Sequence, residues 1–202
     1  MNNTFIIPFK KESAVQQIAC CNWPDKFPYV PGVTFTVWHD SQYFHIKYNV
    51  DEKTVRAEQN VLGGEVYMDS CVECFISPGE NNPYYYNFEF NAAGKVAMAR
   101  RTGRSDPQSA PIEVLESIKV NPSLGTEPFA EMPGKPWSLE VCIPASALWL
   151  DGVQKWDSMK MRMNFYKCGD GLSEPHYITW QPIKTENPDY HRPEFFVPVE
   201  FE

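Results

Sequence analysis

The chain has 202 residues, of which 43 % are apolar, 22 % charged and 14 % aromatic, with 18 prolines against 11 glycines. So much apolar side-chain area excludes a disordered chain, and so many prolines exclude a long helical bundle. The net charge of −8 argues against nucleic acid or an anionic membrane surface as a partner, because both require a basic face.

No stretch approaches the ~20 apolar residues that a membrane span needs. The N-terminus lacks a signal-peptide layout, because Pro8 interrupts its apolar run and Lys10 and Lys11 follow that run instead of preceding it. By default the chain is therefore expected in the cytoplasm. A removed leader would place it in the periplasm or outside the cell.

Apolar and polar residues alternate with a period of two in many short segments, which Pro, Gly and Asn separate. These segments are expected strands, over 33–38, 44–50, 66–76, 84–91, 95–101, 112–120, 137–143, 159–166, 177–180 and 195–201. Short helices are expected over 13–21 and 144–149, and loops over 101–106 and 121–136. This pattern predicts an all-β fold, a single antiparallel β-sandwich spanning residues 1–202, on which residues 1–32 pack as an N-terminal extension.

The six cysteines allow disulfides by their even number, but a chain of this size does not need them for stability. Cys71 and Cys74 have the Cys-x-x-Cys spacing of redox and zinc sites. In a strand, however, residues three apart point to opposite faces, so such a site would need a turn or a helix start here. Free thiols are therefore expected.

The parity of three expected strands separates an apolar face from a polar one. In 66–76 the even positions are mostly apolar, whereas the odd ones include Tyr67 and Glu73 and are expected to look outward. The corresponding polar faces of 84–91 and 159–166 carry Tyr85, Asn87, Glu89, Asn91, Lys160, Arg162, Asn164 and Tyr166. An antiparallel sheet often has a merely solvated side. Carboxylates combined with Arg, Asn and Tyr instead favour directional hydrogen bonding.

Such a face suits a neutral ligand that is rich in hydroxyl groups. Sugar hydroxyls both donate and accept hydrogen bonds, and the apolar C–H faces of a sugar pack on aromatic rings. Tyr67, Trp180 and Tyr190 are candidates for that packing, although each could equally be an ordinary core or surface residue.

The segment 67–78 resembles the Asp-Ser-x-Val-Glu-x-Phe-Ile signature of carbohydrate-binding module family 9, with Glu73 as its glutamate. Further segments resemble later parts of the same family in the same order: 85–94, the Ile-Pro helix start at the end of 137–144, 161–166, 180–182 and 191–196. The resemblance implies a β-sandwich of the immunoglobulin-like or DOMON-like kind. It also implies sugar binding between two aromatic rings, often at chain ends, and structural calcium in some members.

Carried over to this chain, the resemblance implies that Tyr67 is one ring of the sugar clamp, where tryptophan is usual. The second ring would come from the C-terminal region, with Trp180 preferred over Tyr190. The full set of predicted ligand-binding residues is Tyr67, Glu73, Asn87, Glu89, Arg162, Asn164, Trp180 and Tyr190. No catalytic or metal-binding residue is assigned, and no cofactor is expected apart from the structural calcium.

Three alternatives to a non-catalytic sugar-binding protein stay open at this point. Glu73 and Glu89 could be the carboxylate pair of a glycoside-processing enzyme. Four His and seven Met could supply haem ligands, but there is no Cys-x-x-Cys-His attachment motif, and the Met residues at 159, 161 and 163 look like a core stripe. Exposed aromatic residues could instead be buried against a partner protein. The expected partner is a mono- or oligosaccharide, and the sequence makes no prediction of oligomeric state.

Overall fold

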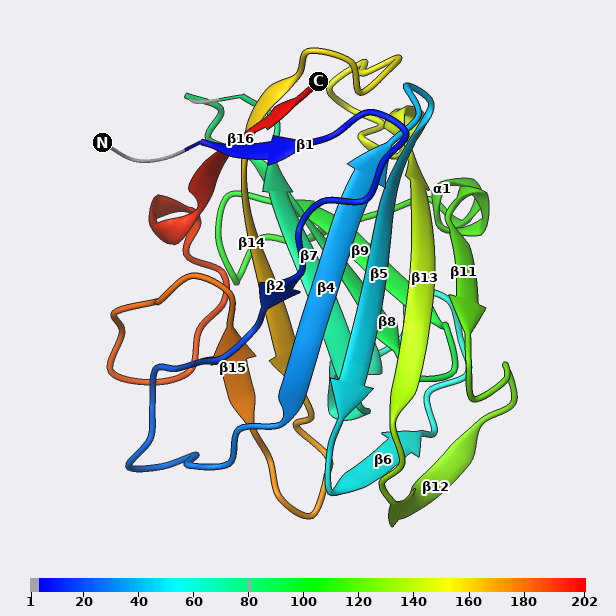
Figure 1. The fold of residues 1–202 in the computed structure, drawn as a ribbon, viewed down its shortest axis with the longest axis vertical. Helices are drawn as coiled ribbons and strands as arrows, with labels where there is room; N and C mark the ends of the chain where they lie inside the picture. The colour runs from blue at the N-terminus through cyan, green and yellow to red at the C-terminus, as the bar shows by residue number, and fades with distance from the viewer. Residues whose placement is uncertain (1–3, 80) are drawn as a thin grey trace.

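A computed structural model describes residues 4–79 and 81–202, which form two β-sheets packed face to face (Figure 1). The nine-stranded sheet has the order β1 (Phe5–Ile7), β16 (Val197–Phe201), β14 (Lys160–Cys168), β7 (Cys71–Ser77), β8 (Tyr85–Asn91), β9 (Val96–Arg101) and β10 (Gln108–Ser109), with β15 (Tyr177–Thr179) beside β14 and β3 (Cys20–Cys21) beside β15. The five-stranded sheet has the order β11 (Lys119–Pro122), β13 (Trp137–Pro144), β5 (Tyr43–Asp51), β4 (Gly32–His39) and β2 (Gln16–Gln17). A separate pair joins β6 (Thr54–Ala57) to β12 (Phe129–Pro133).

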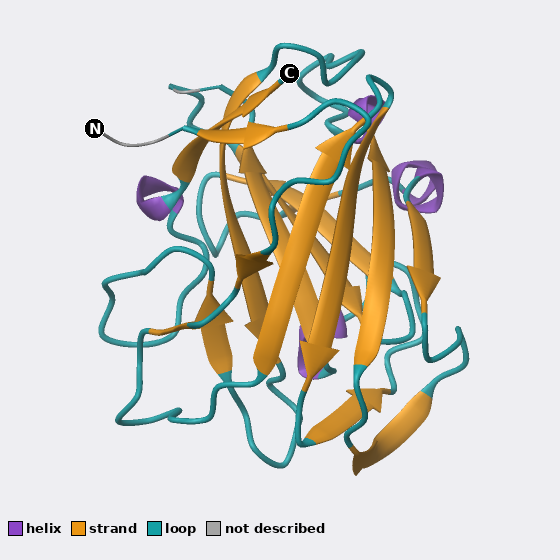
Figure 2. Ribbon diagram, in the orientation of Figure 1, coloured by secondary structure: helices purple, strands orange, loops and turns teal. Residues whose placement is uncertain are grey.

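Helices are short and peripheral, as Figure 2 shows. They are the 3₁₀ turns η1 (Val66–Met68), η2 (Ala145–Ala147) and η3 (Pro193–Phe195) and the α-helix α1 (Ile112–Ser117). In the described part of the chain no helix is long and apolar enough to cross a membrane. The predicted all-β sandwich is confirmed.

The core between the two sheets follows from the alternation of side chains along their strands. Phe35 of β4 stacks on Phe165 of β14 across this layer, with ring centroids 4.1 Å apart. Met161 and Met163 lie on the same side of β14 as Phe165 and are buried in the same cluster. Because apolar faces of two sheets meet here, the hydrophobic effect holds the layers together.

The nine-stranded sheet is buried on its other face as well, which the strand parity did not predict. Every residue of β7 and β8 is buried. A second apolar cluster covers this outer face, with Phe75 on the sheet and Trp23, Ile183 and Phe196 on the segments that cross over it. The expectation that the odd positions of 66–76 look outward to solvent was therefore wrong for Cys71, Glu73 and Phe75, because the chain's own N- and C-terminal segments cover this face; Tyr67 is exposed.

Four segments differ from their expected secondary structure. Residues 13–21 form no helix; they supply β2 and β3, because Gln16 pairs with the free edge of β4 and Cys20 with that of β15. Residues 112–120 divide into α1 and the start of β11, since Pro111 precedes a turn that buries Leu115. The expected strand 66–76 begins only at Cys71, after η1, and the expected loop 121–136 contains β12.

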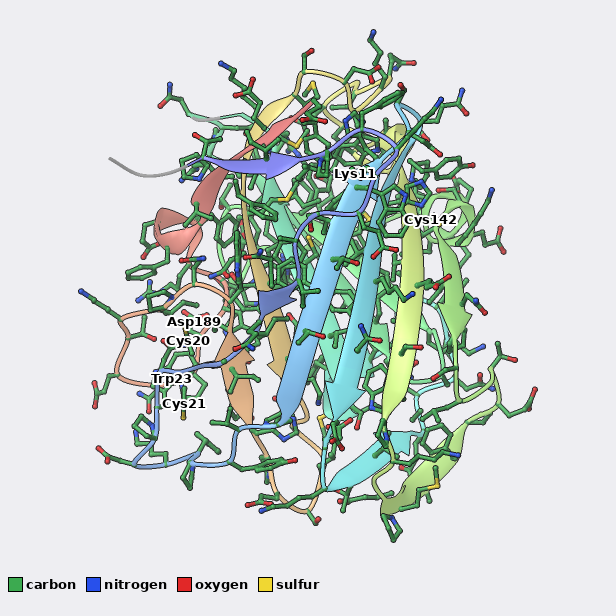
Figure 3. The ribbon with its side chains drawn as sticks, viewed as in Figure 1. Lys11, Cys20, Cys21, Trp23, Cys142 and Asp189 are labelled. Carbon is green, nitrogen blue, oxygen red and sulfur yellow. The ribbon has the colours of Figure 1, made fainter. Side chains whose placement is uncertain are left out.

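The N-terminal segment from Thr4 lies along the sandwich and joins both sheets. β1 adds to the nine-stranded sheet by a parallel pairing with β16, β2 adds to the five-stranded sheet, and β3 adds to β15. Figure 3 shows Cys20, Cys21 and Trp23 on the same side of the molecule as Asp189 of the C-terminal segment. Residues 1–3 of the expected extension lie outside the described residues.

All six cysteines are free thiols in the structure. Cys74 lies in the core between the sheets, whereas Cys71 lies in the cluster on the outer face. The Cys-x-x-Cys spacing therefore falls on opposite sides of one strand, as the strand parity predicts.

One end of the core between the sheets contains a buried ion pair. Lys167 of β14 lies 2.7 Å from Glu52, measured from Nζ to Oε2, and neither side chain is exposed. His176 Nε2 lies 2.7 Å from the same Nζ, and Trp137 Nε1 donates to Glu52 Oε1 at 2.8 Å. Burial, and then the neighbouring lysine, lowers the pKa of His176 to about 3, so this imidazole is neutral. Gly134 leaves room for this arrangement, because a Cβ there would lie 1.7 Å from Glu52 O.

Candidate functional site

The three strands whose polar faces the sequence singled out are direct neighbours in the nine-stranded sheet, in the order β14-β7-β8. Glu73 of β7 pairs with Tyr166 of β14 on one side and with Glu89 of β8 on the other. The next row of the sheet places Phe75 beside Asn87. Since directly opposed residues share a face, the sheet itself brings Glu73 and Glu89 together.

A cavity of about 390 Å³ lies over this outer face, at the β8–β9 end of the rows. Its floor includes Ala97 and Ala99 of β9, which pair with Glu89 and Asn87. These small side chains leave space that larger ones would fill. The walls come from the turns around η1, the segment after β9, the end of β14, β15 and the C-terminal segment 188–191.

Glu73 and Glu89 form the acidic part of the floor, with only 3 % and 8 % of their surface exposed. Glu73 Oε1 accepts a hydrogen bond from the Cys168 thiol at 3.0 Å, and Glu89 Oε1 accepts one from Asn87 Nδ2 at 2.7 Å. Burial, and then the proximity of Glu89, raises the pKa of Glu73 well above its usual value, and burial also raises the pKa of Glu89. The pair therefore holds protons more strongly than exposed carboxyls do.

Arginine donors stand at the rim near β9. Arg101 Nε donates to Asn87 Oδ1 at 2.9 Å, so a chain of hydrogen bonds runs from Arg101 through Asn87 to Glu89. Arg101 Nη1 also donates to the carbonyl oxygen of Arg104, and Arg104 Nε lies 3.3 Å from Asp189 Oδ1. The cavity thus offers acceptors at its floor and donors at its rim.

Aromatic rings line the wall on the side of η1 and β15. Tyr67 of η1 is 36 % exposed, and its hydroxyl donates to Glu65. Tyr190 is buried against the stacked ring of Tyr166, at a centroid distance of 4.3 Å, and its hydroxyl donates to Lys167 O. Tyr177 packs edge-on against Tyr190. Tyr67 is therefore the most exposed of the three rings, while the other two are fixed by packing.

Two further titratable groups face the cavity. Asp170 follows β14, and its backbone N–H donates to Tyr67 O at 3.1 Å, which ties this segment to η1. Burial raises the pKa of Asp170. His191 Nδ1 lies 2.9 Å from the Tyr85 hydroxyl, and burial, followed by the charges of Arg101 and Arg104, lowers the His191 pKa to about 3. The imidazole is therefore neutral.

Five of the eight predicted ligand-binding residues line this cavity: Tyr67, Glu73, Asn87, Glu89 and Tyr190. The other three do not. Trp180 lies in the core between the sheets, edge-on to Phe35 and Phe165. Its strand, β15, ends one residue earlier, and the ring turns inward there, so the structure leaves it no free face at the cavity.

Arg162 and Asn164 are on the outer face of β14 but are covered by the C-terminal segment. Arg162 Nη1 donates to Pro193 O at 3.0 Å. Asn164 Oδ1 accepts from Gln181 N at 3.0 Å, and Asn164 Nδ2 donates to Gln181 O at 3.1 Å. Both side chains therefore hold the segment that carries Tyr190 in place over the sheet.

Several cavity residues were missed by the sequence analysis: Arg101, Arg104, Asp170, Tyr177 and His191. Arg101 ends the strand 95–101, whose alternate residues Ala97 and Ala99 are conspicuously small. That alternation was the available signal for a hollow over this strand. Tyr177 begins the expected strand 177–180, but nothing in the sequence shows that this strand lies beside β14. Asp170 and His191 lie outside every expected strand, so no periodicity places them.

One group of three metal-binding side chains converges in the described part of the chain. It consists of Cys71, Glu73 and Cys168, whose ligand atoms lie within 4.8 Å of one another. Two sulfurs and one carboxylate do not suit calcium, which prefers six to eight oxygen ligands. Asp69, another buried carboxylate, is occupied by protein donors, among them Glu58 N and Gln59 N. The structural calcium stays a prediction.

Fold and site together define a β-sandwich with a polar, aromatic-walled cavity on one sheet. The family model for carbohydrate-binding family 9 matches residues 5–201, and the chain belongs to this family. A crystal structure of a candidate carbohydrate-binding protein from Bacteroides uniformis ATCC 8492 is similar to it over 99 % of this chain and 100 % of that one, with 35 % identity and a TM-score of 0.91.

Two structures of a carbohydrate-binding module of family 9 from Caldicellulosiruptor kristjanssonii share the fold. The complex with cellotriose has 8 % identity and a TM-score of 0.57, and covers 99 % of this chain and 94 % of that one. The complex with glucose has 10 % identity and a TM-score of 0.58, with 99 % and 96 % covered. A search of curated proteins finds no match.

Proposed function

We propose that the chain binds a mono- or oligosaccharide, without catalysing a reaction, in the cavity over β7, β8 and β9. Family membership supports a sugar ligand, as does the related structure from B. uniformis, whose described role is carbohydrate binding. The cavity volume of about 390 Å³ lies in the range of ~300–1,000 Å³ that is typical of small-molecule sites.

The single observation that carries the proposal is the convergence of the cavity residues. Tyr67, Glu73 and Glu89 were chosen from the sequence for sugar chemistry, and all three line one cavity together with Asn87 and Tyr190. Carboxylates and an amide accept from and donate to hydroxyl pairs, and an exposed ring packs on the C–H face of a sugar.

Each group then has a proposed role. Tyr67 stacks on the sugar, and Tyr177 and Tyr190 complete the aromatic wall beside it. Glu73, Glu89 and Asn87 bond hydroxyl groups at the floor. Arg101 and Arg104, which the sequence did not predict as site residues, donate to sugar oxygens at the rim. Arg162, Asn164 and Trp180 act indirectly by holding the covering segment and the core.

Calorimetric titration against a panel of mono- and oligosaccharides tests the proposal. Tyr67→Ala should weaken binding at least about tenfold, because a stacked ring contributes on the order of 1 kcal/mol or more beyond its area. Tyr84→Ala is the matched control, since Tyr84 is 37 % exposed against 36 % for Tyr67 and lies outside the cavity. Equal affinities of the two variants, or no heat with any sugar, would reject the proposal.

Hydrolysis of a glycoside is the second candidate function, and the facing pair of Glu73 and Glu89 favours it. A raised pKa suits a general acid, and retaining and inverting glycosidases both use two carboxyls. Turnover of chromogenic glycosides that Glu73→Gln abolishes, while sugar affinity is retained, would replace the non-catalytic proposal with this one.

A further inference from the structure

Buried carboxylates elsewhere in this chain have a cationic partner. Asp69 lies 3.3 Å from Arg56 Nε, and Glu52 lies 2.7 Å from Lys167 Nζ. The partly buried Asp151 lies 3.2 Å from Arg100 Nε. These pairs are expected, because a carboxylate that is removed from water without a counter-charge is costly.

Glu73 and Glu89 depart from this rule. Among the described residues, no lysine, arginine or histidine nitrogen lies within ion-pair distance of either carboxylate; the ion pairs present involve other acidic groups. Their hydrogen-bond partners are a thiol and an amide, and both are neutral. In each glutamate one carboxylate oxygen accepts such a hydrogen bond, and both carboxyl groups line the cavity.

Burial raises the pKa of Glu89 more than Arg101 and Arg104 lower it from a distance, so the net shift is upward. Five acidic side chains line the cavity against two basic ones. Arg104 is paired with Asp189, and Arg101 directs Nε to Asn87 and Nη1 to a carbonyl oxygen. His191 is neutral, because burial lowers its pKa to about 3. An occupant that supplies positive charge at the floor would complete the arrangement.

We propose that the cavity prefers an amino sugar, a 2-amino-2-deoxyhexose with a free ammonium group, which places that ammonium against Glu73 and Glu89. This inference rests on the proposed sugar-binding function and specifies its ligand. A bare metal ion fits less well, because the converging ligand group contains Glu73 and two thiols but not Glu89. A sugar ring extends the ligand to Tyr67 and the arginines, which a small cation does not reach.

Binding of such a ligand is coupled to protons. Glu73 and Glu89 retain protons because burial and, for Glu73, the neighbouring carboxylate favour the neutral form. An ammonium group stabilises the charged form, so its binding releases protons, and its affinity falls as the pH falls. The titratable and charged groups around the pair are Glu65, Tyr67, Cys71, Arg101, Arg104, Tyr166, Cys168, Asp170, Tyr177, Asp189, Tyr190 and His191.

Calorimetry with glucosamine, glucose and N-acetylglucosamine tests the inference. The three sugars share a ring, and N-acetylglucosamine keeps the C2 nitrogen without its charge. Glucosamine should bind at least about tenfold more tightly than either neutral sugar, given the strength of a charge interaction in a partly desolvated site. Its heat should also change between two buffers of different ionisation enthalpy, which reports the released protons, whereas the heat of glucose should not.

Neutralising the floor sharpens the test. Glu89→Gln keeps the shape of the side chain and should remove most of the preference for glucosamine. Glu140→Gln removes the same charge from the exposed face of the other sheet and should leave the preference unchanged. Glu73→Gln is a second floor variant, expected to act as Glu89→Gln does.

The two proposals fail in different ways. Glucose that binds as tightly as glucosamine, or a glucosamine preference that survives both floor substitutions, overturns the amino-sugar inference and leaves sugar binding in place. The absence of heat with all three sugars and with oligosaccharides overturns the proposed function, and this inference falls with it.

Discussion

Lys167 and Cys168 are consecutive residues of β14, yet their side chains enter two buried polar clusters of opposite character. Lys167 points between the sheets and completes an ion pair with Glu52, supported by His176 and Trp137. Cys168 points to the outer face, where its thiol, a neutral partner, lies near Tyr67 O and donates to Glu73. One sheet thus separates a carboxylate that has a cationic partner from carboxyl groups that have none.

The difference teaches how to recognise a site in this fold. In the core cluster each charged group meets a charged or strongly polar partner, so nothing further is needed to hold it. In the cavity the carboxylates Glu73 and Glu89 face each other, with a thiol and an amide as their only direct partners among the described residues. A carboxylate buried for structural reasons has a cationic partner, whereas buried carboxyl groups without one beside a cavity indicate a ligand.

Removing the lysine should have the largest effect on stability. Lys167→Met leaves Glu52 buried without its counter-charge and should lower the free energy of unfolding by ~3–5 kcal/mol. Denaturant unfolding measures the change. Lys160→Met, at an exposed position of the same strand, should cost less than ~0.5 kcal/mol. The double variant Glu52→Gln with Lys167→Met should recover part of the loss; additive losses would contradict the pairing.

The pH dependence of the core cluster should come next. The His176 pKa is lowered to about 3 from an ordinary 6.5, so the unfolded chain binds this proton more readily than the folded one. The stability contributed by the neutral His176 is fully present above pH 6.5. It is lost as the pH falls toward 3, at up to roughly 1.4 kcal/mol per pH unit. His176→Gln should flatten the unfolding free energy between pH 6.5 and 5. His45→Gln, at the other sheet, is the control, and identical slopes in both variants would count against this assignment.

Neutralising the cavity floor should have a smaller effect on stability and of the opposite sign. Burial raises the pKa of Glu73 above its ordinary 4.5, so the folded chain binds this proton more strongly, and stability falls as the pH rises through the raised pKa. Glu73→Gln removes that loss. At neutral pH the free energy of unfolding of the variant should be higher than that of the wild type, or lower by no more than about 1 kcal/mol. Its affinity for sugar should drop. A loss as large as that of Lys167→Met would show that the two clusters do not differ.

The smallest stability effect is expected at the rim. The Arg104 side chain is 65 % exposed, pairs with Asp189 and donates at long range to Pro188 O, so Arg104→Ala should change the unfolding free energy by less than ~0.5 kcal/mol. Calorimetry should nevertheless show weaker sugar binding, because a donor to sugar oxygens is lost. Unchanged affinity would place Arg104 outside the site.

The sandwich was predictable because strand alternation is a local property. Met161, Met163 and Phe165 differ from Arg162 and Asn164 in polarity, and this difference alone assigns the two faces of β14. The helix over 112–117 was not predictable in the same way, since Ile112 and Val114 favour a strand by propensity. Burial of Leu115 against the sheets decided otherwise.

The candidate site divides along the same line. Glu73, Asn87 and Glu89 could be identified from their places on strands, because the alternation of polar and apolar residues along a strand shows which side chains share its polar face. Trp180 illustrates the limit: an aromatic residue has the same identity in a core and at a sugar site, and only its packing against Phe35 and Phe165 distinguishes the two.

By itself the sequence determined most of the strands, the alternation of their side chains between two faces, and the family, because each depends on residues close together in the chain. The tertiary structure alone decided that β14, β7 and β8 are neighbours, that the terminal segments cover their polar face, and that Ala97 and Ala99 leave a cavity there. The order of the strands, and the covering of the sheet by the terminal segments, depend on contacts between segments that are far apart in the chain. No local pattern in the sequence specifies such contacts. Most of the aromatic side chains pack either between the two sheets or on the outer face of the nine-stranded sheet, whereas the ring of Tyr67 is exposed at the cavity.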